Sequence, residues 1–474
     1  MSTITELCTT PPDASPELEY SQLLENLTAL NTLTTDTANV TPAEAETLLQ
    51  WLPAAMMPTE ALLPPEHVLE DDDVTPPAVL APYQAVCHLA LQIIARLAPA
   101  DISTDLAVAL IAQTSAHDPW TTAPSRALST SLLDQHTFPA STLTTLLTAL
   151  KPHFTAPHPT LTPLAHAAVR QSTFRAPLLP PTPPSYRSTH PATPTLLHWV
   201  TLHLPPSHLE PSWHLIVPPT LTLLDDTHAP TKARGAHVLS ALLLHPQTPA
   251  MLVRTGLAPV LWDAALPCVL SLPPLTPTAV SVPLLTAGYD ALVALARVMG
   301  AGKARERARL LGVLLRRGVL AGMRYAGEVV AVAEVLVGVV GVLVGEMGVW
   351  CVRHLGEVVG VLVGVLVDPF VGVRWGLAVG AVRALVEVVR VGWSRVGGYV
   401  WEVVRACVVC WRRVVEDGGW GEGGETVMAE LRRCVGVVAA VVERGEWEGM
   451  VKEVVAVEKS AVGLFEGTVE QMRS

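Results

Sequence analysis

The stretch Trp213-His-Leu-Ile-Val-Pro-Pro-Thr-Leu-Thr-Leu-Leu-Asp-Asp226 is followed by Lys232-Ala-Arg-Gly-Ala-His-Val-Leu-Ser-Ala-Leu-Leu243. We interpret the two as one helix, a tight acidic turn and a second helix. Pro218 and Pro219 are expected in the first turn of the first helix, because proline lacks only an N–H group that this turn leaves unpaired. The two aspartates are expected to close that helix, since their carboxylates can accept hydrogen bonds from the free amides of the next one.

The same spacing recurs later in the chain. Lys232 follows Asp226 by six positions, and Arg374 follows Asp368 by six positions. An acidic turn, a basic residue one turn into the second helix, and small then large apolar positions are typical of a HEAT-type repeat. Two such units, in a chain with no convincing hairpin signal, predict an all-α fold, a HEAT/armadillo-like α-solenoid of irregular helical repeats. The residues expected to form the repeat turns are Asp225, Asp226, Lys232, Asp368, Pro369 and Arg374.

Composition is consistent with a long solenoid inside the cell. The chain has 474 residues, of which 50% are hydrophobic and 16% are charged, which is enough apolar material for a continuous buried seam. Its net charge of -12 argues against a protein that coats nucleic acid through its overall field. The N-terminus resembles neither a secretory signal nor a mitochondrial presequence, and seven scattered cysteines suit reduced thiols. A cytoplasmic and nuclear location is therefore expected.

The second half of the chain is rich in valine and glycine and raises the question of a membrane span. Glu346, Arg353 and Glu357 interrupt it with spacings of 7 and 4 residues, which places them on one face of a helix. The longest uncharged windows, Val335–Gly345 and Val358–Val367, hold 11 and 10 residues, whereas a spanning helix needs about 20. No membrane contact is predicted.

Composition changes sharply near residue 290, where proline and histidine give way to valine and glycine. Because valine and glycine are poor helix formers, the helices are placed by the periodicity of charged and apolar positions. They are expected near 17–30, 41–51, 78–98, 103–115, 124–135, 141–151, 160–171, 303–326, 328–345, 348–366, 370–391, 394–415, 427–443 and 446–471. The side chains expected to be buried are Leu221, Leu224, Val238, Leu239, Leu242 and Leu243 in the first repeat, and Leu377, Val382, Leu385 and Val389 in the second.

A proline-rich segment is expected to separate two lobes. Residues 176–194 contain seven prolines, which is typical of a semi-rigid linker or surface loop. A polyproline ligand for an aromatic groove is the less favoured alternative. The predicted organisation is an N-terminal helical lobe at 1–175, the linker or loop at 176–194 and a C-terminal HEAT-like lobe at 195–474.

The sequence contains no recognisable catalytic motif. It has no phosphate loop, nucleophile elbow, zinc-protease helix or kinase signature, so no enzymatic activity and no cofactor are predicted. Cys407 and Cys410 lie on adjacent turns of a predicted helix, and only Cys434 is near them in sequence. A structural zinc site needs four ligands. Two thiols in the core are therefore favoured over a metal site or a redox motif.

One basic cluster extends from Arg297 to Arg324, with Glu306 as its only acidic interruption. It could face an acidic partner or nucleic acid, but a solvated helix face is the favoured interpretation, and the lack of interleaved aromatics argues against nucleic acid. Tryptophan and arginine are the residue types most enriched among interface anchors. The candidate partner surface consists of Arg305, Arg309, Arg316, Arg317, Trp375 and Trp393.

Several short stretches resemble a known family. They are the opening stretch from Trp213 to Asp226, Lys232-Ala-Arg-Gly, Arg254-Thr-Gly-Leu257, Leu266-Pro-Cys-Val-Leu-Ser-Leu-Pro-Pro-Leu-Thr-Pro277 and Pro283-Leu-Leu-Thr-Ala-Gly-Tyr289. Together they resemble the second Tel-two-interacting protein of fungi, the small subunit of the Triple-T cochaperone complex. The resemblance is strong over about 80 residues and continues more loosely to the Asp368 turn, whereas residues before about 170 match only in helical character.

The resemblance implies a HEAT-like, non-enzymatic scaffold. Such a protein would bind the larger HEAT-repeat subunits of the Triple-T complex. With the heat-shock chaperone machinery it would help newly made phosphatidylinositol-kinase-related protein kinases to mature. The alternative is a karyopherin-like or other HEAT-repeat transport adaptor, which would bind signal peptides on a concave face lined by tryptophan and asparagine. Asparagine is scarce in this chain, which disfavours that alternative. An enzyme with an unrecognised site ranks third.

Overall fold

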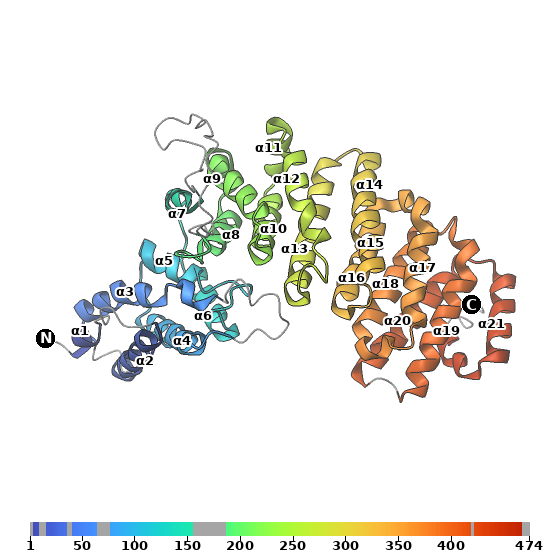
Figure 1. Ribbon diagram of the computed structural model, residues 1–474, viewed down its shortest axis with the longest axis horizontal. Coiled ribbons are helices and arrows are strands. Elements are labelled where there is room, and N and C mark those ends of the chain that lie inside the picture. The colour runs from blue at the N-terminus through green and yellow to red at the C-terminus, as the bar shows by residue number, and fades with distance from the viewer. Residues whose placement is uncertain are drawn as a thin grey trace, which may run out of the picture. The chain divides into compact units, whose positions relative to one another are not determined.

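The computed structural model describes residues 3–8, 16–35, 40–63, 76–154, 186–418 and 421–466. These residues form helices joined by turns, with no strand among them (Figure 1). The predicted all-α fold is therefore confirmed. The chain divides into two compact units, Met1–Arg254 and Thr255–Ser474, and each is treated by itself below.

In the first unit, side chains cap the starts of several helices. Thr41 accepts a hydrogen bond from the backbone of Glu44, whose carboxylate accepts one from the backbone of Thr41 at 2.9 Å. Thr122 and Ser125 form the same reciprocal arrangement. Such boxes satisfy the free amides of a helix's first turn. The helices are α1 (Thr3–Leu7), α2 (Pro16–Leu33), α3 (Pro42–Met56), α4 (Leu80–Leu97), α5 (Thr104–Ile111), α6 (Ala123–Asp134), α7 (Ala140–Phe154), α8 (Thr193–His203), α9 (Pro206–Leu224), α10 (Ala229–Leu244) and α11 (Thr248–Thr255), with a 3-10 turn η2 (Glu60–Leu62).

Helices of this unit stack on their second neighbours along the chain. α2 packs against α4, α4 against α6, α3 against α5, and α8 against α10. This alternation is typical of helical repeats, in which each unit buries its apolar face against the next.

The repeat around Asp226 differs from the prediction in one respect. α9 begins at Pro206, so Pro218 and Pro219 lie inside the helix and not in its first turn. Pro206 takes the favoured position at the start of the helix. Burial of Trp213 and Ile216 before the prolines, and of Leu223 after them, holds the helix together across the missing N–H groups. Four of the six predicted core residues are buried, whereas Leu221 and Leu243 are half-buried.

From residue 303 on, the second unit matches the predicted helix positions closely, whereas its first two helices, between residues 258 and 299, were not predicted. Its elements are α12 (Ala258–Ala265), η4 (Leu266–Leu270), α13 (Thr278–Met299), α14 (Ala304–Val313), the π-helix η5 (Leu314–Leu320), α15 (Ala321–Ala326), α16 (Val330–Met347), η6 (Gly348–His354), α17 (Leu355–Val367), η7 (Val371–Arg374), α18 (Trp375–Gly392), η8 (Val396–Tyr399), α19 (Val400–Glu416), α20 (Glu422–Ala439), α21 (Arg444–Val457), η9 (Lys459–Ala461) and α22 (Val462–Phe465). The helix expected at 446–471 ends at Val457, because Glu458 accepts hydrogen bonds from Ser460 and starts the turn η9. The helix expected at 160–171 lies outside the described residues.

The second unit has two layers of helices. α16, α18 and α20 stack side by side, and α17 and α19 form the neighbouring layer (Figure 1). Glycine permits the close approach of α18 and α20, because a β-carbon on Gly423 would overlap the indole ring of Trp375. Val382, Leu385 and Val389 are buried as predicted, whereas Leu377 is half-buried. The valine- and glycine-rich half is therefore a packed helical unit.

The boundary between the units lies after Arg254 and not at the proline-rich segment 176–194. Residues 155–185 are outside the described part of the chain, but the end of that segment belongs to the first unit. Tyr186 and Ala192 are buried, and Pro194 lies in the first turn of α8. Because α8 and α9 both contact α7, the chain on either side of the prolines forms one core.

Within the described ranges, two helical segments are long and apolar enough to cross a membrane by length and composition. They are Thr278–Met299 and Val330–Val367, and 61% and 39% of their apolar windows are buried inside the protein. The second segment contains the turn η6, which carries Arg353. The absence of membrane contact stays a prediction.

Candidate protein-binding surfaces

The first repeat turn is anchored by a buried carboxylate. Asp226 accepts a hydrogen bond from the backbone of His228 at 2.8 Å and one from the hydroxyl of Tyr186 at 2.9 Å. It also forms an ion pair with Arg187 at 3.1 Å. Asp226 therefore both closes the turn that precedes α10 and holds the segment that leads into α8. Its neighbour Asp225 is exposed at the end of α9.

The second repeat turn has the same hydrogen bond from the backbone to the aspartate, but it is exposed to solvent. Asp368 accepts a hydrogen bond from the backbone of Phe370 at 2.8 Å, but Asp368 and Pro369 are both exposed. Arg374 forms an ion pair with Glu334 of α16 at 2.8 Å. Its counterpart in the first repeat, Lys232, is half-buried on α10. In both turns the aspartate side chain thus accepts a hydrogen bond from the backbone amide two residues later.

Four of the predicted surface arginines lie along one helical rod, α14–η5–α15. Arg305 and Arg309 are exposed on α14, and Arg316 and Arg317 are exposed in the π-helix. Arg309 forms an ion pair with Glu306 at 2.7 Å. Among the described residues no ion pair reaches Arg305 or Arg317, so their charges are available to a partner.

The two predicted surface tryptophans are not brought together. Trp375 is the first residue of α18 and Trp393 follows its last residue, so the helix separates them by about 27 Å. Trp393 is 64% exposed. Trp375 is 46% exposed and its ring covers Gly423 of α20. The six candidate residues therefore do not form one continuous surface.

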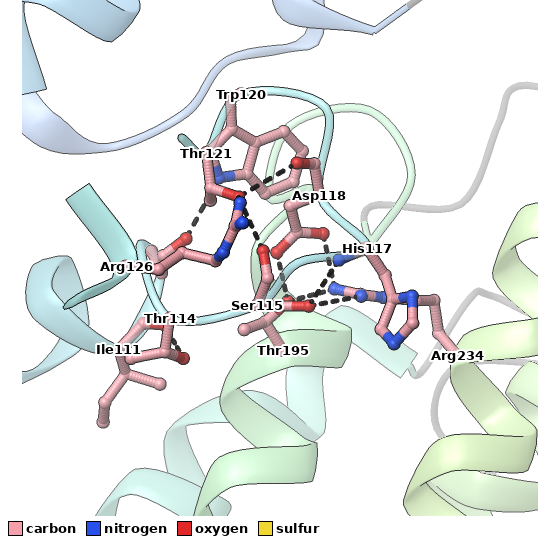
Figure 2. A network of polar contacts seen from close by, with 11 residues as sticks. Ile111, Thr114, Ser115, His117, Asp118, Trp120, Thr121, Arg126, Thr195 and Arg234 are labelled. Atoms are coloured by element: carbon pink, nitrogen blue, oxygen red, sulfur yellow. Dashed lines mark hydrogen bonds and ion pairs between the residues drawn. The ribbon is translucent and has the colours of Figure 1, made fainter. Parts of the chain in front are cut away.

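A buried polar network in the first unit was not foreseen (Figure 2). The guanidinium of Arg234, on α10, forms an ion pair with Asp118 and donates hydrogen bonds to Thr195 and, at 2.7 Å, to Ser115. Thr195, on α8, donates to Asp118 at 2.5 Å. Burial raises the pKa of Asp118 even though Arg234 lies beside it. The network joins the loop between α5 and α6 to α8 and α10.

The loop that carries Asp118 is itself held by hydrogen bonds. Figure 2 shows the buried indole of Trp120 beside Asp118, and its N–H donates to the carbonyl of Ala112 at 3.0 Å. Thr121 donates to the carbonyl of Ser115 at 2.6 Å. The Asp-Pro-aromatic sequence that begins at Asp118 also occurs at Asp368, and this repetition is the signal that could have pointed to the loop.

Three histidines lie beside this network. The rings of His117 and His237 stack with centroids 4.1 Å apart, and His198 lies 6.3 Å from His237. Burial, together with the nearby Arg234, lowers the pKa of His198 to about 4, and burial with His117 and Arg234 lowers that of His237 to about 3. The cluster is therefore neutral at physiological pH.

The cysteines of α19 are core side chains. Cys407 and Cys410 are buried, and so is Cys434 on α20. A hydrogen bond with Cys434 and burial raise the pKa of Cys407, and burial raises that of Cys410 to about 12. Thiols held in this way are poor nucleophiles and poor metal ligands. No group of three potential ligands that could hold a metal ion occurs in the described part of the chain.

The family model of the Tti2 family matches residues 106–373, which is more than half of the chain. The chain belongs to the Tti2 family. The match begins well before the stretch at Trp213 and includes Asp118, Thr195 and Arg234. The resemblance to the family is therefore confirmed and extends further towards the N-terminus than expected, whereas the fungal type stays a prediction. No curated protein matches this Tti2-family chain.

Solved structures with a similar fold are of yeast importin-beta. A structure of Kap95p bound to RanGDP has a TM-score of 0.50 and 14% identity over 99% of this chain and 55% of that one. A structure of yeast importin-beta (Kap95p) has a TM-score of 0.47 and 14% identity over the same shares. The Tti2-family chain thus spans about half the length of this relative. At such identity the first likeness shows the fold alone, a HEAT-type α-solenoid.

Proposed function

We propose that this protein is a non-enzymatic scaffold subunit of the Triple-T cochaperone complex. The observation that carries the proposal is the match of the Tti2 family model to residues 106–373. In this role the chain binds the larger HEAT-repeat subunits of the complex. With the heat-shock chaperone machinery it supports the maturation and stability of phosphatidylinositol-kinase-related kinases in the cytoplasm and nucleus.

The exposed arginines of α14–η5–α15 support a partner surface on the second unit. Arg305 and Arg317 are exposed without an ion pair in the described residues, on a protein whose net charge is -12. A local excess of positive charge on an acidic protein attracts an acidic patch and steers its approach. The rod is also interrupted by the π-helix η5, and π-helical turns occur frequently at functional sites. An acidic face of a larger subunit is the expected counterpart.

Depletion and rescue test the proposal. Depleting the protein should lower the steady-state amounts of the related kinases without changing their transcripts. The wild-type chain should restore them, and the double variant Arg305→Glu with Arg317→Glu should not. The matched control is Arg444→Glu, which reverses an exposed charge that pairs only with Glu448 on the same helix. Kinase amounts that do not change on depletion would exclude the assignment.

The second candidate is a karyopherin-like transport adaptor, which the likeness to Kap95p favours. A similar fold does not imply the same binding partner, and the match to the Tti2 family favours the first candidate. A binding assay with RanGDP separates the two. The Triple-T assignment expects no binding, whereas a stable complex with RanGDP would favour the adaptor.

A further inference from the structure

A groove of about 620 Å³ lies along the outer side of α19 in the second unit. Trp401 and Val408 of α19 form its floor, Val363 of α17 forms one wall, and Val454 and Val457 of α21 form the other. Trp401 is 49% exposed and Val457 is 89% exposed. Large apolar side chains that gather in one exposed hollow mark interaction sites more often than isolated ones do.

Beyond the groove, the same side of α19 carries further apolar side chains between arginines. Trp401, Val408 and Val415 follow one another at spacings of seven residues, so they lie on one side of the helix over about 21 Å. Arg405 and Arg412 lie on the same side, four residues after Trp401 and Val408, and separate the apolar side chains. Val415 is 47% exposed. A stripe of this length corresponds to about four helical turns, about twice the span of one set of i, i+3, i+4 and i+7 anchors on an amphipathic helix.

The wall formed by α17 is low. Gly360 and Gly364 flank Val363 on the exposed face of α17, and nothing lies within 4 Å of the positions that their β-carbons would take. The backbone of a second helix can therefore approach α17 closely. The opposite wall is fixed in place, because the turn η9 contacts both α19 and α21, and the indole of Trp411 donates to Ser460 in that turn at 2.9 Å.

The rim of the groove is acidic. Three of the four charged residues that line it are glutamates, Glu402, Glu453 and Glu458, and the fourth is Arg405. Glu402 and Glu453 have no ion-pair partner in the described ranges, so their charges face whatever occupies the groove. Lysine or arginine beside the apolar ridge of a bound segment would complement them.

We propose that this groove binds an amphipathic helix of another protein, with an apolar ridge seated on Trp401, Val408 and Val457 and basic residues flanking it. The surface is distinct from the arginines of α14–η5–α15, since its rim has the opposite charge. It also lies largely beyond the residues matched by the family model. The proposal does not depend on membership of the Triple-T complex, and its test uses no Triple-T subunit.

Fluorescence anisotropy with the full-length chain and designed peptides tests the proposal. The first peptide is an amphipathic helix with a leucine ridge and lysine flanks. The second has the same ridge with glutamate flanks, and the third is a scrambled form of the first. The first peptide should bind at least ten times more tightly than the other two. A scrambled peptide that binds equally well would overturn the proposal, because charge attraction to an acidic protein would then suffice.

Substitutions of groove residues test whether the peptide binds in the groove. Val408→Glu and Val457→Glu should each weaken the first peptide at least tenfold, although each adds negative charge that would strengthen non-specific attraction. Val457→Ala should weaken it less, and unfolding is not expected because Val457 is exposed. The matched control, Val373→Glu, changes a valine that is 75% exposed in the turn η7 and should leave binding unchanged. Unaltered binding by Val457→Glu would contradict the proposal.

Other occupants give different results. Removal of residues 467–474 should leave the affinity unchanged, and a fivefold rise would show that the chain's own end fills the groove. Sedimentation should show no self-association that Val457→Glu abolishes, since such behaviour would make the groove an interface between two copies. Binding to phosphatidylcholine vesicles that is lost in Val457→Glu would assign the groove to lipid. Each of these three results would overturn the proposal.

Discussion

Arg234 forms a buried ion pair with Asp118, a residue 116 positions earlier in the chain. The side chains of the two residues are 13% and 5% exposed. The pair holds the loop between α5 and α6 against α10. Thr195, on α8, donates a hydrogen bond to Asp118 and so holds α8 against the same loop. It explains why the chain on both sides of the proline-rich segment folds as one unit.

Loss of one partner should destabilise the first unit strongly. Arg234→Met leaves the carboxylate of Asp118 buried without its cation, which costs about 3–5 kcal/mol in comparable sites. The double variant Asp118→Asn with Arg234→Met should lose clearly less than the sum of the single changes. Hydrogen exchange of α8 and α10 measures this unit separately from the other. Equal protection in Arg234→Met and the wild type would show that the pair contributes nothing.

Acid should weaken the same region. The pKa of His198 is lowered to about 4 and that of His237 to about 3, whereas an unfolded histidine titrates near 6.5. Between these pH values the unfolded chain binds protons that the folded chain does not bind. The free energy of unfolding is therefore at its full value above about pH 6.5 and falls as the pH drops towards 4. Each of these histidines adds a slope of up to about 1.4 kcal/mol per pH unit in that window.

The charged surroundings of the histidine cluster are Arg234, His117 and His203, with Asp118 beyond the arginine. His237→Gln should flatten the pH dependence of protection in α8 and α10. His214→Gln changes an exposed histidine on α9 and should leave the dependence as it is. A pH profile that His237→Gln leaves unaltered would assign the acid sensitivity to other groups.

Substitution of Gly318, in the π-helix, should destabilise the protein because one atom lies close to its Cα. A β-carbon at this position would lie 2.5 Å from the buried hydroxyl of Tyr289, which has no hydrogen-bond partner among the residues that the structure describes. Gly318→Ala should cost about 1–3 kcal/mol through overpacking. In the background of Tyr289→Phe, which removes that hydroxyl, the same change should cost little. Thermal unfolding of the four proteins gives the coupling, and additive effects would contradict the contact.

The two repeat turns should differ in strength. Asp368→Ala removes one backbone hydrogen bond from an exposed site and should cost about 1 kcal/mol. Asp226→Ala also removes the hydrogen bond from Tyr186 and the ion pair with Arg187, so its cost should be larger, about 3 kcal/mol. Denaturant titrations of the two variants compare them. Equal losses would mean that the buried contacts of Asp226 add nothing to its hydrogen bond with the backbone of His228.

Local pattern was sufficient to place most helices. The charges of the valine- and glycine-rich half recur at helical offsets, and the segment expected at 303–326 is the rod α14–η5–α15. The acidic turns were also predictable, because an aspartate accepts from an amide two residues later within the same short segment. Glycine's low helix propensity did not prevent helices there, and glycine permits close packing, as between Gly423 and the ring of Trp375.

Contacts between distant residues could not be predicted in the same way. Nothing near Arg234 in sequence indicates that its partner is Asp118, and nothing near Gly318 indicates that it packs closely against Tyr289. Trp375 and Trp393 were grouped by residue type, but α18 holds them at its two ends. The groove over α19 likewise depends on how α17 and α21 are placed around it, which periodicity along one helix does not contain.

The central claim, that this chain is a binding subunit, is tested most directly by size-exclusion chromatography with light scattering. The full chain is used, because a cut at residue 195 would divide the network of Asp118, Thr195 and Arg234. Mixed at micromolar concentration with the purified larger HEAT-repeat subunit of the Triple-T complex, it should elute as one complex of summed mass. The variant Arg305→Glu with Arg317→Glu should elute separately. Separate elution of the wild-type chain would contradict the account.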